Sequence, residues 1–207
     1  MFKYENLLKI KDNVNIESGV RYITADIARL GKETTVIMVW DGLKVIDVIE
    51  MNGVTTDISA SRIKDLCTRY RVSLSNVIID ADGIGGGVVD QLKGVKSFIN
   101  NSRAIEVRNR PNNYSNLKSQ CYYLLAEYVE LEKIKLGDID NNIYENICQE
   151  LQVIKQKDMD LDGKLSIIPK DIIKKIIGRS PDYADCMMMR MFFELKTNSD
   201  ITRMRFY

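Results

Sequence analysis

Three aspartates of this 207-residue sequence lie in apolar surroundings, where an isolated carboxylate is costly to bury. Asp26 falls within the alternating segment RYITADIA, Asp80 follows the apolar run VII, and Asp185 precedes a run of methionines. A divalent cation would satisfy all three carboxylates, and oxygen-rich sites select Mg²⁺ or Mn²⁺. Two such ions about 4 Å apart can activate a water molecule and stabilise the leaving 3′-oxygen of a phosphodiester.

The amino-acid composition excludes several classes of catalytic and metal site. The sequence contains no histidine, which excludes Ser-His-Asp and Cys-His catalysis and all histidine metal ligands. Its four cysteines are far apart without a C-x-x-C pair, which is typical of reduced, buried thiols and not of a zinc site. The formal net charge of +1 does not indicate nucleic-acid binding by the chain as a whole, and no apolar run is long enough to span a membrane.

Two other motifs resemble ligand loops but lack required residues. The segment VIIDADGIGGG (77–87) lacks the spacing of a dinucleotide-binding loop and the Gly-Lys-Ser/Thr of a phosphate loop. Its glycines instead predict a sharp turn after Asp80 and a closely packed helix, with Asp82 capping the turn through its side chain. The segment DMDLDGKLSIIP begins like a calcium loop but ends on Pro169, where a glutamate is required.

The elements that must position these aspartates alternate between strand and helix patterns. Three strands (21–28, 34–40, 43–51) are expected to form a meander. The second and third are joined by Asp41-Gly42, a strong hairpin signal. The later expected strands are 76–80, 96–100 and a hairpin of 151–156 with 164–169, and the expected helices are 57–71, 86–93, 114–131, 139–150, 170–177 and 181–195.

This order predicts the ribonuclease H-like fold, an α/β architecture. Its mixed sheet has three antiparallel strands followed by parallel strands, helices on both faces, and here an extra late β-hairpin. Residues 1–19 are expected to form a lead-in or linker, and residues 20–207 the nuclease-like domain. In this fold the first strand neighbours the strand ending at Asp80. Asp185 is expected in the first turns of the last helix, after Ser180 as N-cap and Pro181 as the first helical residue.

Four segments together resemble the nuclease domain of the large terminase subunit of tailed bacteriophages. The resemblance covers about residues 20 to 195, and its segments are ADIARLGKETTVIMVWDG, VIIDADGIGGGVVDQL, NNYSNLKSQCYYLLAE and GRSPDYADCMMM. It implies that Asp26, Asp80 and Asp185 are catalytic ligands of two Mg²⁺ or Mn²⁺ ions. Asp182 is an additional candidate ligand, although a carboxylate in a first helical turn also simply stabilises the helix dipole.

The resemblance also implies a function, a location and partners. The expected activity is metal-dependent endonucleolytic cleavage of concatemeric double-stranded viral DNA during genome packaging, in the cytoplasm of an infected or lysogenic bacterial host. The expected partners are DNA, the ATPase domain of the large subunit, the small terminase subunit and the portal protein. This sequence has no phosphate loop, so motor activity is not expected of it. The alternatives are another ribonuclease H-like nuclease such as a junction resolvase, a non-catalytic packaging module, and a nucleotide-binding module.

DNA is expected to be held through its phosphates, because cleavage requires access to the backbone. The alternative for each basic side chain is a solvated surface charge. The candidate phosphate contacts are Arg29, Lys32, Arg108, Arg110, Lys118 and Arg179, with Lys155, Lys157 and Lys164 on the late hairpin.

Overall fold

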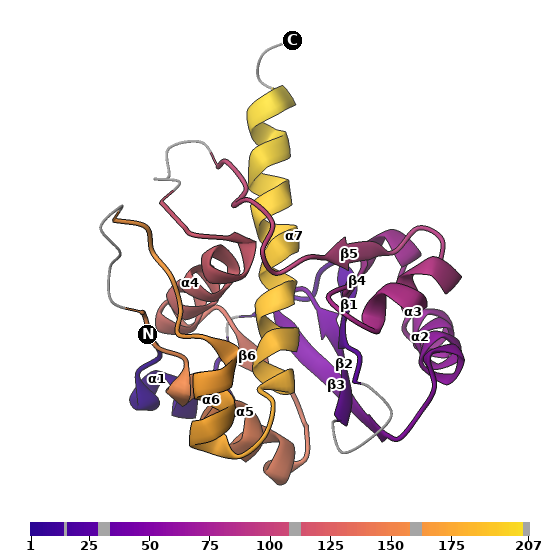
Figure 1. The fold of residues 1–207 in the computed structure, drawn as a ribbon, viewed down its shortest axis with the longest axis horizontal. Coiled ribbons are helices and arrows are strands. Elements are labelled where there is room, and N and C mark those ends of the chain that lie inside the picture. Colours follow the sequence, from indigo (N-terminus) through magenta and orange to yellow (C-terminus); the bar gives the residue numbers. More distant parts are fainter. Residues whose placement is uncertain (15, 29–33, 108–112, 158–162, 205–207) are drawn as a thin grey trace.

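A six-stranded mixed sheet forms the centre of the molecule (Figure 1). The computed structural model describes residues 1–14, 16–28, 34–107, 113–157 and 163–204, and side chains up to residue 196. The strands lie in the order β5-β4-β1-β2-β3-β6. Their bounds are β1 (Arg21–Asp26), β2 (Thr34–Asp41), β3 (Lys44–Asn52), β4 (Val77–Asp80), β5 (Lys96–Phe98) and β6 (Lys135–Leu136).

The pairing of β1 with β4 determines where two of the aspartates lie. Strands β1, β2 and β3 are antiparallel, as predicted, and β4 pairs with β1 in parallel. Ala25 is in register with Ile79, so Asp26 and Asp80 end neighbouring strands at the same edge of the sheet. The turn between β2 and β3 contains Gly42 at φ 60°, a left-handed conformation that glycine adopts without strain. Strand β6 was not predicted.

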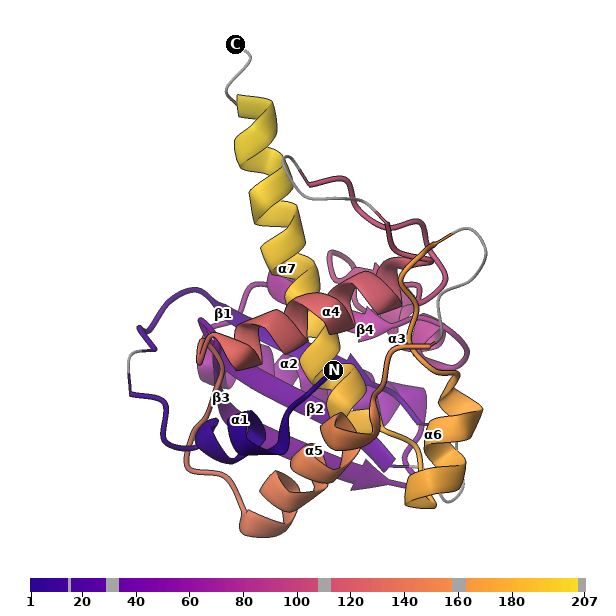
Figure 2. The same cartoon turned by 90° about the vertical axis from the view of Figure 1, so that its left-hand side faces the viewer.

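Helices cover both faces of the sheet. Alternate residues of β2 point to opposite faces, so Ile37 packs with the residues under α2 and α3, and Met38 packs with those under α4 and α7. Figures 1 and 2 show α7 crossing the sheet on the α4 side and projecting beyond it. The helices are α1 (Tyr4–Lys9), α2 (Thr56–Tyr70), α3 (Gly85–Gln91), α4 (Leu117–Glu130), α5 (Asn141–Val153), α6 (Lys170–Ile177) and α7 (Asp182–Met204), with a 3₁₀ turn η1 (Leu74–Asn76).

The late hairpin is shorter than the sequence predicted. Residues 151–153 belong to α5, because Leu151 continues the buried stripe of that amphipathic helix. Among the described residues of this segment, antiparallel pairing consists of one bridge, Gln156 with Ile167, and two flanking backbone hydrogen bonds. Residues 104–107, which follow β5, have no regular secondary structure.

The first residues, expected as a lead-in, contain a packed helix. Leu7 of α1 and Ile10 are fully buried, and the Leu136 amide donates to the Ile10 carbonyl at 2.8 Å. Asn13 donates from its side chain to the Ile134 carbonyl, so this segment lies beside β6. Within the described ranges, no helix is both long and apolar enough to cross a membrane.

Candidate catalytic carboxylate site

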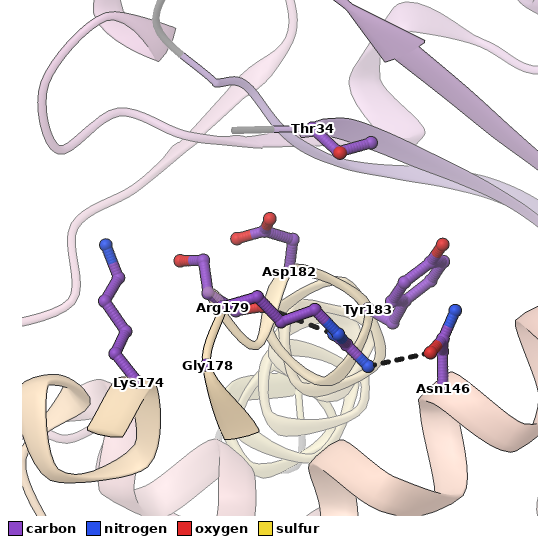
Figure 3. Close-up of a pocket in the computed structure, with 8 residues that line it drawn as sticks. Thr34, Asn146, Lys174, Gly178, Arg179, Asp182 and Tyr183 are labelled. Atoms are coloured by element: carbon purple, nitrogen blue, oxygen red, sulfur yellow. Dashed lines mark hydrogen bonds between the residues drawn. The ribbon is translucent and has the colours of Figure 1, made fainter. Parts of the chain in front are cut away.

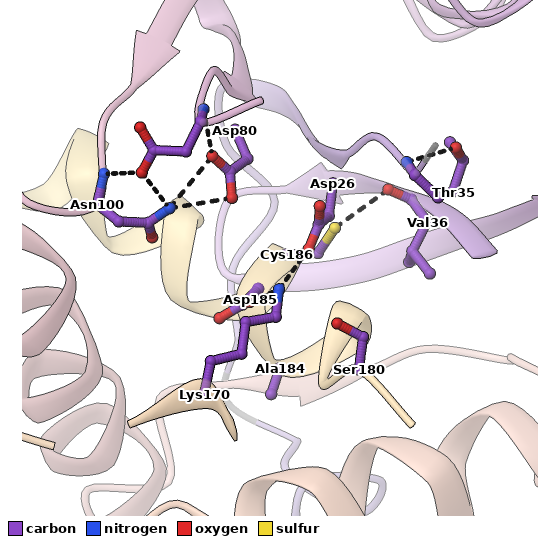
Figure 4. A network of polar contacts seen from close by, with 12 residues as sticks. Asp26, Thr35, Val36, Asp80, Asn100, Lys170, Ser180, Ala184, Asp185 and Cys186 are labelled. Carbon is purple, nitrogen blue, oxygen red and sulfur yellow. Dashed lines mark hydrogen bonds and ion pairs between the residues drawn. The ribbon is translucent and has the colours of Figure 1, made fainter. Parts of the chain in front are cut away.

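Asp26, Asp80 and Asp185 come from three different elements to one end of the sheet (Figure 4). Asp26 and Asp80 are the last residues of β1 and β4, with exposed fractions of 9% and 8%. Asp185 is 1% exposed in the first turn of α7, where its amide donates to the Pro181 carbonyl at 2.9 Å. Helix α7 therefore begins one residue later than predicted, with Pro181 in place of Ser180 as the flanking residue.

Asp185 is the best-paired carboxylate of the three. Its Oδ1 accepts from the Tyr122 hydroxyl at 2.7 Å and lies 2.7 Å from Lys118 Nζ. Its Oδ2 accepts from Lys170 Nζ at 3.0 Å. Burial alone would raise the pKa of Asp185, but the two ammonium groups outweigh it and hold that pKa well below its usual range.

Asp26 is in the opposite situation. Its Oδ2 is buried without a hydrogen-bond donor among the described residues, and its nearest cation, Lys170 Nζ, is 3.9 Å away. Burial raises the pKa of Asp26 well above its ordinary value, and the neighbouring carboxylates reinforce the shift. Lys170 lies between Asp26 and Asp185. Burial opposes its charge, but the two carboxylates raise its pKa above the usual range for lysine. The site therefore sets the carboxylates of Asp26, Asp80 and Asp185 against the two ammonium groups of Lys118 and Lys170.

Replacing Asp26 by asparagine is expected to stabilise the metal-free protein by about 1 kcal/mol or more at pH 8. Because the folded-state pKa of Asp26 is raised, its ionisation weakens folding as pH rises through that value, and the penalty is absent below the unfolded-state value of about 4. The gain should therefore vanish in acid. Urea unfolding in chelator at both pH values measures it, with the exposed Asp65→Asn of α2 as control. A less stable Asp26→Asn protein at pH 8 would contradict the argument.

Asp80 is held by its own turn and by Asn100. Its Oδ1 accepts from the Asp82 amide at 2.9 Å, and Asn100 Nδ2 lies 3.2 and 3.1 Å from its two oxygens. The predicted capping by the Asp82 side chain is wrong. That carboxylate instead accepts from the Asn100 amide at 2.9 Å and from Nδ2 at 2.7 Å, because the end of β5 lies next to the turn. Desolvation raises the pKa of Asp80.

The glycine-rich turn serves packing, as the sequence indicated. A Cβ on Gly85 would collide with the Asp80 carbonyl, so α3 can start directly behind β4 only with glycine there. The amide of Ala81 donates to the Phe98 carbonyl at 2.9 Å, which joins the same turn to β5. The backbone that carries Asp80 is therefore fixed on both sides.

Arg179 lies in a buried polar network that holds the start of α7. It pairs with Glu150, which is fully buried on α5, and donates to Asn146 at 2.9 Å and to Gln149 at 3.1 Å. The second oxygen of Glu150 accepts from the Ala184 amide at 2.8 Å, so Glu150 caps the helix that carries Asp185. Arg179 was predicted as a DNA contact, and its charge is already engaged here.

Asp182 lies on the rim of a pocket of ≈ 440 Å³ next to the carboxylates (Figure 3). Its side chain points toward the start of β2, and its charge adds to the raised pKa of Asp26. Asp182 is therefore near enough to Asp26 for the two charges to interact. The pocket is lined by Thr34, Asn146, Lys174, Gly178, Arg179, Ser180, Asp182 and Tyr183.

A groove of ≈ 560 Å³ opens on the other side of the site. Lys118, Lys157 and Lys170 contribute three positive charges to its wall against the single carboxylate of Asp82. The remaining lining residues are Asn100, Asn101, Ser115, Asn116, Ser119, Ser166, Ile167, Ile168, Pro169 and Ile173. Four other predicted phosphate contacts, Arg29, Lys32, Arg108 and Arg110, lie outside the described residues.

Sequence reasoning missed most partners of the carboxylates. Lys118 and Tyr122 are four residues apart on α4 and so share one helix face, a pattern that could have indicated a common target. Asn100, Glu150 and Lys170 carry no comparable local pattern. Across the ranges that the structure describes, no three acidic or cysteine side chains converge closely enough to hold a metal ion in the present arrangement, with Lys170 between two of them.

Comparison with known proteins gives no match to any family model and none to a curated protein sequence. Solved structures match over nearly the whole chain. The nuclease domain of the large terminase subunit gp2 of bacterial virus Sf6 superposes with a TM-score of 0.79 at 20% identity, covering 92% of this chain and 97% of that one. This chain has the fold of a phage large-terminase nuclease domain.

Two more terminase nucleases have the same fold. The large terminase nuclease of thermophilic phage G20c matches with a TM-score of 0.57 at 18% identity, covering 91% of this chain and 96% of that one. The nuclease domain of Thermus phage P74-26 large terminase matches with a TM-score of 0.56 at 16% identity, covering 91% and 93%. The predicted ribonuclease H-like fold and the predicted resemblance to terminase nucleases are confirmed at the level of the fold.

Proposed function

We propose that this chain is a metal-dependent endonuclease that cleaves double-stranded concatemeric DNA during packaging of a phage genome. The observation that carries the proposal is that Asp26, Asp80 and Asp185 lie at one end of the sheet, on β1, β4 and α7, and that Asp26 Oδ2 is buried with no donor among the described residues. A buried anionic oxygen without a donor is the environment that a cation stabilises. The terminase nuclease fold is consistent with this activity.

The donor set fits Mg²⁺ or Mn²⁺. Carboxylate oxygens are the ligands that these ions prefer, and the neighbouring Cys186 thiol donates to the Val36 carbonyl. Related structures support the choice: structures of the Sf6 nuclease domain are described with manganese and with calcium, and those of the G20c nuclease with magnesium and with cobalt. We propose Asp26, Asp80 and Asp185 as ligands, with Asp182 as an additional candidate.

Bound metal ions would supply a nucleophilic water and positive charge next to the scissile phosphate. The chain's own residues would prepare the site. Asn100 orients Asp80 by contacting both of its oxygens, and Glu150 fixes the first turn of α7. Lys118 and Lys170 pair with Asp185 in the metal-free protein and also line the groove, where we propose that they contact the phosphates of a bound strand.

The groove beside the carboxylates is the proposed path of the DNA strand next to the cleavage point. Its lysines and its amide and hydroxyl groups suit phosphate oxygens, whose contacts supply most of the affinity for DNA without sequence preference. We retain Arg29, Lys32, Arg108 and Arg110 as candidate phosphate contacts. The ATPase domain of the large subunit, the small terminase subunit and the portal protein are the proposed partners, in the cytoplasm of the bacterial host.

The purified chain is expected to nick and then linearise supercoiled plasmid DNA with Mn²⁺ or Mg²⁺, with little sequence preference. Excess EDTA should abolish cleavage because the carboxylates alone supply no electrophile, and ATP should not change the rate. Agarose electrophoresis over time measures both effects. Cleavage that continues in excess EDTA would contradict the metal mechanism, and preferential cutting of four-way junctions over linear duplex would instead favour a resolvase.

A further inference from the structure

The Tyr122 hydroxyl is a buried polar group whose described hydrogen bond goes to a carboxylate of the site. Tyr122 is fully buried, and its hydroxyl donates to Asp185 Oδ1 at 2.7 Å. It lies one turn after Lys118 on α4, so both side chains reach the same oxygen. Asp185 is thus held from α4 by one neutral donor and one cation.

The neutral donor and the two cations respond differently to an incoming metal ion. A dication repels the ammonium groups of Lys118 and Lys170, whose long stems allow them to move away. The Tyr122 hydroxyl is uncharged and fully buried against Asp185 Oδ1, so a nearby dication does not repel it as it repels an ammonium group. The Tyr122 ring is enclosed by core residues and cannot adopt another rotamer unless those residues repack.

We propose that Tyr122 is a positioning residue that holds the Asp185 carboxylate in its metal-binding orientation. A carboxylate has about four lone-pair sites, so Oδ1 can accept from Tyr122 and still coordinate a cation. Hydrogen bonds of this kind to ligating carboxylates typically change metal affinity or activity 10–100-fold when they are removed. This inference rests on the proposed metal-dependent function.

Tyr122→Phe tests the inference, and the adjacent Tyr123→Phe is the matched control. Both variants lose one hydroxyl from the same helix, but the Tyr123 hydroxyl has no hydrogen-bond partner among the described residues. Titration calorimetry with Mn²⁺ alone gives the dissociation constant without DNA. Tyr122→Phe is expected to weaken Mn²⁺ binding about tenfold or more, and Tyr123→Phe to leave it within twofold of the unsubstituted protein.

Cleavage kinetics and unfolding distinguish positioning from a general structural effect. Tyr122→Phe should raise the Mn²⁺ concentration for half-maximal cleavage by a factor similar to the change in binding, and saturating Mn²⁺ should restore much of the rate. Its thermal midpoint in EDTA should stay close to that of Tyr123→Phe. Unchanged Mn²⁺ affinity in Tyr122→Phe, or equal losses in both variants, would overturn this inference alone. Failure of the unsubstituted protein to bind Mn²⁺ would overturn the proposed function as well.

Discussion

Asp80→Asn is expected to lower the rate of DNA cleavage by at least about a hundredfold, because it removes one negative ligand from the proposed metal site. The substitution leaves the fold in place. An asparagine oxygen can still accept from the Asp82 amide, the bond that shapes the turn after β4. The substitution also removes a carboxylate whose charge is costly to bury, so the metal-free variant should be at least as stable as the unsubstituted protein. Plasmid cleavage under saturating Mn²⁺ measures the rate.

Asp82→Asn is the matched control, two residues away. The Asp82 carboxylate lies at the edge of the groove and accepts both hydrogen bonds from Asn100 on Oδ2, so an asparagine oxygen in that place keeps both of them. Cleavage by this variant is expected to stay within about tenfold of the unsubstituted rate, since it removes a neighbour of the ligand and not the ligand. An inactive Asp82→Asn with a normally active Asp80→Asn would show that the second ligand is assigned to the wrong residue.

Glu150→Ala is expected to destabilise the protein by about 3 kcal/mol, the lower end of the cost of removing one partner of a buried ion pair, because the Arg179 side chain left behind is 34% exposed. Glu150 is fully buried, and its loss leaves the Arg179 guanidinium without its carboxylate and the Ala184 amide without an acceptor. Such a loss is a large share of the roughly 5–15 kcal/mol that stabilises a domain. Urea unfolding curves with an unchanged denaturant slope measure it.

Gln149→Ala removes the exposed partner of Arg179 and is the control for Glu150→Ala, which removes the buried partner. Gln149 accepts from the same guanidinium at 3.1 Å but is exposed on the outer face of α5. Its removal is expected to cost less than about 1 kcal/mol, because water replaces the lost hydrogen bond. Equal destabilisation by both variants would mean that the buried position of Glu150 has no special role at the start of α7.

The sequence by itself determined the order of β1 to β5 with the helices between them, and which aspartates are unusual. Alternation in the first strands, the Asp41-Gly42 turn and the helical spacing that follows are local signals, and they predicted this part of the topology but neither α1 nor the edge strand β6. Apolar neighbours marked Asp26, Asp80 and Asp185 as costly to bury, and all three are at most 9% exposed. Their roles as metal ligands stay predictions. Local pattern was misleading at 151–153, where an amphipathic helix continues into residues that also suit a strand.

Only the tertiary structure decided what each carboxylate contacts. Tyr122 and Asp185 are 63 residues apart, and Glu150 and Ala184 are 34 apart, so no local period links either pair. From the sequence alone, Arg179 and Lys118 were both predicted to contact DNA phosphates. In the fold one neutralises Glu150 and the other Asp185, because helix packing buried those acids and burial requires a partner for the charge.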